Sequence, residues 1–136
     1  MDFVNRLMAK VNDITPSDLR LRTGYLGTEE SFVVYPLPGS RTVREYMDGS
    51  KDRELNFEFA MRSKDQRKIH ETLWSVQNQL DELMLLDSLD GSFQFESIDI
   101  TNTPFINNAD DQGWFVFLLD IQAKITVIKE EATTNG

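Results

Sequence analysis

The chain has 136 residues, of which 40% are hydrophobic and 27% charged, and this suits one folded domain with a single core. It contains no cysteine, which excludes disulfides and cysteine-based metal sites, and we expect neither a signal peptide nor a membrane-spanning segment from its sequence. The formal net charge of −9 opposes general nucleic-acid binding, because such binding depends on Lys and Arg contacts to phosphates.

The first predicted element is a short amphipathic helix near the N-terminus. Asp2 is a suitable N-cap, and the pattern ends at Asn12 and Asp13. The apolar residues that share one arc at helical spacing are Phe3, Val4, Leu7, Met8 and Val11.

Strands are predicted next, over residues 19–23, 31–37, 41–47 and 54–62. Pro36 and Pro38 suit a strand end or a sheet edge, because proline cannot donate a ladder hydrogen bond. The last of these strands alternates most clearly, which predicts a half-buried position. Its apolar face carries Leu55, Phe57, Phe59 and Met61.

A long helix is predicted after Ser63, over residues 65–86. Ser63 and Gln66 have the spacing of a capping box, with Ser63 as the N-cap. We expect the apolar stripe of this helix to pack on the sheet face that bears Leu55, Phe57 and Phe59. The stripe consists of Ile69, Leu73, Val76, Leu80 and Leu83.

Two further strands are predicted over residues 92–101 and 113–128. The apolar phase shifts between Phe95 and Ile98, which predicts a β-bulge. The segment from Asn102 to Gln112 is predicted to be a polar loop that docks on a partner through its apolar residues. The predicted fold is therefore α+β, with a mainly antiparallel sheet, one long helix packed on a face and a short N-terminal helix. Residues 1–128 should form a single domain and residues 129–136 a flexible tail.

No residue pattern typical of catalysis is evident, and no cofactor is predicted. His70 is the only histidine, and a surface position is its simplest interpretation. Glu96, Asp99 and Asp120 lie on the last two strands, which leaves open a small, nuclease-like enzyme with a metal-binding carboxylate cluster. Solvated acids are the simpler interpretation in a chain with 23 of them.

Surplus apolar residues favour contact with other protein subunits. Some lie off the helix stripe or in the predicted loop, and others extend onto the second sheet face. A basic cluster around Asp48 and Gly49 could also dock an acidic partner, including a second copy, although interleaved acids equally suit a mixed surface. The predicted interface residues are Trp74, Leu85, Trp114, Val116, Leu118, Phe105, Ile106, Arg41, Arg44, Lys51 and Arg53.

Four segments carry a resemblance to a known family. They are VREYMDGSKDRELNF over residues 43–57, the helix after Ser63, IDITNTPFI over residues 98–106, and DDQGW over residues 110–114. Through them the chain resembles phage minor capsid proteins related to the tail terminators of long-tailed bacteriophages. The resemblance spans residues 31–128 and implies a structural virion protein without catalytic residues.

The same resemblance implies a hexameric ring that caps the tail tube and joins it to the head. The implied partners are further copies of the chain, the major tail tube protein and a head-completion or neck protein, with assembly in the bacterial host cytoplasm and no membrane. Another neck protein of similar size remains an alternative. In such a ring, acids on the channel wall would let DNA pass without specific binding. The candidates are Asp99, Asp110, Asp111 and Asp120.

Overall fold

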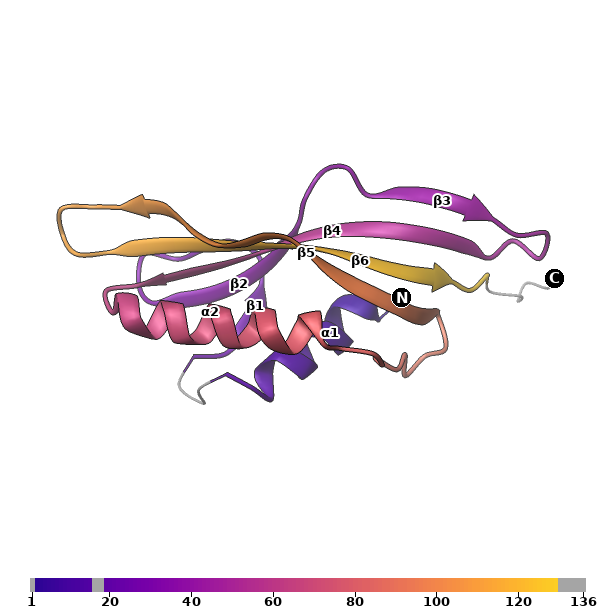
Figure 1. The fold of residues 1–136 in the computed structure, drawn as a ribbon, viewed down its shortest axis with the longest axis horizontal. Helices are drawn as coiled ribbons and strands as arrows, with labels where there is room; N and C mark the ends of the chain where they lie inside the picture. The colour runs from indigo at the N-terminus through magenta and orange to yellow at the C-terminus, as the bar shows by residue number, and fades with distance from the viewer. Residues whose placement is uncertain (1, 16–18, 130–136) are drawn as a thin grey trace.

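The computed structural model describes residues 2–15 and 19–129, which form one twisted sheet with both helices on the same face (Figure 1). Only Lys129 of the predicted flexible tail lies within the described residues. Neither helix in the described part of the chain has the length and apolar character needed to cross a membrane. In chain order the elements are α1 (Phe3–Asn12), β1 (Leu21–Thr23), β2 (Ser31–Pro36), β3 (Arg41–Glu45), β4 (Lys51–Ser63), α2 (Gln66–Asp81), β5 (Phe93–Ala109) and β6 (Phe115–Val127).

The sheet is mixed, although all but one of its strand pairs are antiparallel. Its order is β1-β2-β4-β6-β5, and β3 pairs with the first part of β4 beyond the end of β2. The exception is the parallel pair of β1 and β2, in which Leu21 lies opposite Phe32. Parallel pairing usually needs a long crossover. Because β1 has only three residues, residues 24–30 suffice to return the chain.

The core lies between the two helices and the inner face of the sheet, which we define as the face that they cover. The predicted packing of the helix stripe on Leu55, Phe57 and Phe59 is confirmed for Ile69, Leu73, Val76 and Leu80, because all belong to one buried cluster. It was wrong for Leu83, which lies beyond the end of α2 and is only half-buried. Phe3 of α1 joins this cluster, with its ring centroid 5.8 Å from that of Phe57. The stripe residues that are fully buried are Ile69, Leu73, Val76 and Leu80.

The predicted N-cap residue and the predicted C-terminal end of the second helix were wrong. The N-cap of α2 is Asp65, whose carboxylate accepts a hydrogen bond from the Lys68 N–H at 3.1 Å. Ser63 instead accepts a bond from the Asp65 N–H at 3.0 Å and donates to Glu30 at 2.6 Å. The helix ends at Asp81, five residues before the predicted Leu86.

Residues 82–92, here called the connector, leave the helix because α1 holds them elsewhere. Leu86 is buried in the core. The Asp2 carboxylate accepts a bond from the Leu89 N–H at 2.7 Å, and the Arg6 guanidinium donates to the Asp87 carbonyl at 2.7 Å. Asp2 thus occupies the N-cap position of α1 but makes no side-chain cap bond there. These contacts outweigh the helix propensity of the leucine-rich segment.

The predicted loop over Asn102–Gln112 is mostly strand. β5 continues to Ala109, and Asn102 and Phe105 lie opposite Asp120 and Leu118 of β6. β5 pairs only with β6. An edge position tolerates Pro104 and polar residues, because one side of the strand needs no ladder bonds. The predicted bulge after Phe95 is confirmed, and further register shifts follow along β5.

Candidate assembly surfaces

The outer face of the sheet, opposite the helices, is not covered by any helix of the described chain (Figure 1). Strand register aligns its side chains in rows that cross β2, β4, β6 and β5. One row is apolar and consists of Val33, Ala60, Leu118 and Phe105. The adjacent row is polar and consists of Tyr35, Glu58, Asp120 and Asn102.

Two carboxyl groups face each other within the polar row. The Tyr35 hydroxyl donates to Glu58, and the Asn102 amide donates to Asp120 Oδ2 at 2.7 Å. Burial raises the pKa of Glu58 to about 7, and the neighbouring Asp120 carboxylate adds to the rise. Asp120 Oδ1 is buried and receives no bond from any fixed donor. When Glu58 is protonated, its O–H can supply that donor.

Burial also affects Tyr35, whose pKa lies above its usual value because its hydroxyl is partly removed from water and bonds to Glu58. The phenol therefore stays protonated and remains a donor over the physiological pH range. Sequence reasoning missed this site. The alternation of β4 and β6 indicates that Glu58 and Asp120 leave the core face, but only strand register places them opposite each other.

The four acids predicted to line a channel do not form one cluster. Asp120 is only 8% exposed, so its predicted presentation to solvent was wrong; its partners Asn102 and Glu58 keep it from water. Asp110 fixes the turn before β6 by accepting bonds from the Gln112 and Trp114 N–H groups at 3.0 and 2.9 Å. Asp99 lies 3.2 Å from the Lys124 ammonium, and Asp111 is exposed in the turn.

The carboxylates considered for a metal-dependent enzyme are likewise separate. Within residues 2–15 and 19–129, no three His, Asp or Glu side chains are grouped so that they could hold a metal ion. His70 is exposed on α2, with its ring 5.3 Å from that of Phe117.

The apolar residues predicted at interfaces divide into three groups. Val116 is buried between its cross-strand neighbours Arg62 and Asn108, so it does not extend the exposed surface as predicted. Trp114 is half-buried below the cations of Arg62 and Lys64, 4.5 and 5.1 Å from its ring, and Leu118 is also half-buried. The exposed members are Trp74, Leu85, Phe105 and Ile106. Leu85 lies in the connector rather than on the helix.

The β3–β4 hairpin, residues 41–54, projects beyond the body of the molecule (Figure 1). The predicted basic cluster lies here, with Arg41, Arg44 and Lys51 exposed and Arg53 half-buried. Arg41 pairs with Glu54 at 2.9 Å. Sequence reasoning missed the apolar tip, where Val43, Tyr46 and Met47 are exposed beside the predicted turn at Asp48 and Gly49.

A second apolar surface lies between the connector and the start of β5. It is an open groove of about 660 Å³, flanked by Asp87. The connector also exposes Met84 and Leu89, which sequence reasoning did not identify. The apolar residues that line the groove are Leu85, Leu86, Leu89, Phe93 and Phe95.

The described structure thus combines a sheet with one open face and apolar side chains exposed on a hairpin, a connector and an edge strand, which are features of a protein that contacts other proteins. The family model for bacteriophage tail terminator protein matches residues 7–127, so the chain belongs to that family and the resemblance is confirmed. A search of curated proteins finds no match. Family membership makes the chain a phage structural tail protein and a component of the virion.

Proposed function

We propose that the chain forms a closed hexameric ring that caps the tail tube of a long-tailed phage and joins it to the head. The observation that carries this proposal is the family match over residues 7–127. The partners would be neighbouring copies, the major tail tube protein and a head-completion or neck protein. Assembly would take place in the bacterial host cytoplasm, without a catalytic step.

The exposed apolar side chains support self-association. They form groups on three different surfaces. The groups are Val43, Tyr46 and Met47 on the hairpin, Met84, Leu85 and Leu89 in the connector, and Phe105 and Ile106 on β5. Exposed apolar surface of this kind usually marks a protein contact. Contacts between unlike surfaces repeat head-to-tail, and they close into a ring when the rotation between copies allows it.

Charge supports the passage of DNA through such a ring. The net charge of −9 repels phosphates, and exposed acids such as Asp99 and Asp111 could face the channel. Asp110 could contribute charge while it holds its turn. Asp120 is excluded from this role by its burial.

Tail length measures terminator activity directly. Purified tube protein should polymerise to uncontrolled lengths alone, and added chain should stop growth and leave a ring at one tube end in electron micrographs. Phage that lack the chain should likewise make tails of irregular length. If those tails keep a uniform length but fail to join heads, the chain acts as another neck protein and the terminator proposal fails.

A further inference from the structure

We propose that neighbouring copies contact each other as knob and groove: the β3–β4 hairpin tip of one copy, with Met47 at its apex, seats in the groove between the connector and β5 of the next. This inference rests on the proposed ring and names the two surfaces that would build it. Both surfaces expose apolar side chains, Met47 at the tip and Leu85 and Leu89 at the groove, and neither is covered within the described chain. The groove lining also includes the polar residues Asp87, Ser88 and Gln94.

The knob is preorganised by its turn. The Gly49 N–H donates to the Tyr46 carbonyl at 2.9 Å, and the Asp48 carboxylate accepts from the Ser50 N–H at 2.9 Å. Gly49 has a φ of +89°, a conformation that favours glycine. Met47 is therefore held on a fixed turn with its side chain in solvent. A methionine suits this position because its flexible thioether adapts to the shape of an apolar groove.

The groove is also preformed. Asp2 and Arg6 anchor the backbone of the connector at Leu89 and Asp87. The connector forms one wall of the groove, and these bonds fix that wall without a partner. Leu89 is 78% exposed at this wall. Phe93 forms part of the groove but is buried in the core cluster, which makes that side rigid. Rigid surfaces lose little conformational freedom when they associate.

The charges near the two surfaces are partly complementary. Residues 81–91 contain four acids and no base, and one of them, Asp87, lines the groove. The hairpin carries four bases and four acids, and Lys129 lies against Gly49. Three of the four hairpin acids are hydrogen-bonded or paired locally: Asp48 with Ser50, Asp52 with Tyr46 and Thr126, and Glu54 with Arg41. The exposed Arg44 and Lys51 are therefore the hairpin charges that could face the acidic connector of the next copy.

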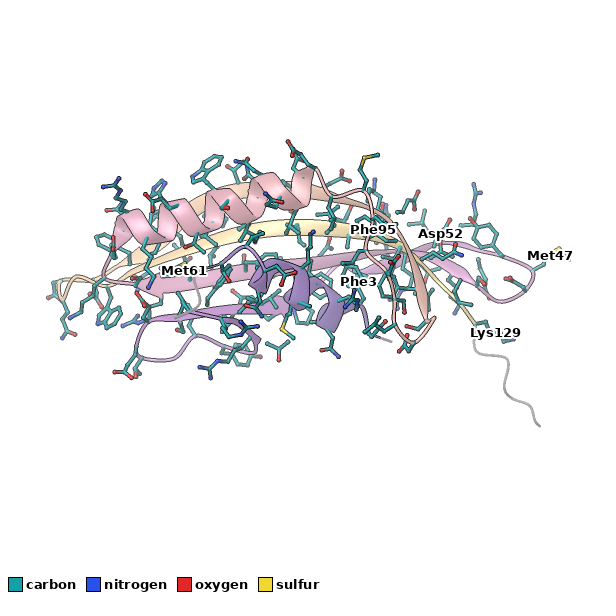
Figure 2. All side chains as sticks on the ribbon, turned by 90° about the horizontal axis from the view of Figure 1, so that it is seen from below. Phe3, Met47, Asp52, Met61, Phe95 and Lys129 are labelled. Carbon is teal, nitrogen blue, oxygen red and sulfur yellow. The ribbon has the colours of Figure 1, made fainter. Side chains whose placement is uncertain are left out.

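The shape of the molecule favours contact in trans. In Figure 2, Met47 lies at the extreme end of the extended hairpin, while Phe95 of the groove lies within the body. The tip therefore points away from its own groove. Because knob and groove are different surfaces, each copy can both give and receive one contact, as a closed ring requires.

Engineered cysteines test this contact without background, since the chain contains none. Met47→Cys and Leu89→Cys introduce thiols at two exposed positions. Under mild oxidation, a mixture of the two single variants should yield mainly mixed dimers. The double variant should yield a ladder of covalent oligomers on a non-reducing gel. Tyr25 is also exposed but lies outside the knob and the groove. Tyr25→Cys is therefore the matched control partner and should not cross-link to Met47→Cys.

A second measurement tests the same contact without introducing cysteines. Met47→Asp should weaken self-association at least tenfold by light scattering, and Met47→Leu should retain association. Both should keep the natural melting temperature at protein concentrations too low for association. If the chain assembles but Met47→Cys and Leu89→Cys do not cross-link, or if Met47→Asp assembles normally, the contact is wrong and the ring stands. If the natural chain forms no oligomer, either alone or on tube ends, the proposed ring itself fails together with the contact.

Discussion

Replacing Glu58 with glutamine should stabilise the protein at high pH and remove part of its pH dependence. In the unfolded chain the carboxyl group has its ordinary pKa of 4.5, whereas burial beside Asp120 raises the pKa in the fold to about 7. The folded state therefore binds more protons between these values. This contribution to stability is fully present below pH 4.5 and is lost as the pH rises through about 7.

The expected change in stability follows from the rise in the pKa of Glu58. At about 1.4 kcal/mol per pKa unit, this rise corresponds to about 3 kcal/mol of unfolding free energy. Glu58 keeps part of its side chain in water, and screening reduces the expected effect to about 1–2 kcal/mol. Glu58→Gln is neutral at every pH, and its amide can donate to the Asp120 Oδ1 atom that has no fixed donor. The variant should equal the natural protein near pH 5 and exceed its stability by that amount at pH 8.

Urea unfolding at a series of pH values between 5 and 8 measures this difference, at protein concentrations low enough to prevent association. Glu96→Gln removes one negative charge at an exposed position of β5 and serves as the control. If the unfolding free energy of the natural protein and that of Glu58→Gln change equally with pH, Glu58 does not have the raised pKa on which this prediction depends.

Three further changes test other parts of the structure. Leu80→Ala should lower the free energy of unfolding by about 2–5 kcal/mol, because it opens a cavity in the core; an unchanged thermal melt would reject the packing of α2. Phe105→Ser combined with Ile106→Ser should cost little stability but impair particle assembly, and a normal yield of infectious particles would exclude these β5 residues from an interface. Asp111→Lys should leave the ring intact and slow DNA ejection, with the defect easing in salt because charges are screened beyond about 10 Å at 0.1 M. Asp13→Lys is its exposed control, and equal ejection rates for both would argue against a charged channel.

Local periodicity identified most of the core in advance. Alternation along residues 54–62 predicted which face of β4 is buried, and helical spacing predicted the buried sides of α1 and α2. These patterns are reliable because each reflects one element that turns a single face to the core. The chain's acidity and its resemblance to tail terminators were likewise present in the sequence.

Only the tertiary structure decided where elements end and which side chains meet. α2 stops at Asp81 because contacts with α1 hold the connector, and β5 extends to Ala109 because β6 offers it a partner strand. Both outcomes depend on residues distant in sequence, which periodicity cannot report. The pairing of Glu58 with Asp120 follows from the register of β4 and β6. The projection of Met47 from the hairpin and the groove beside the connector both result from how distant segments pack together.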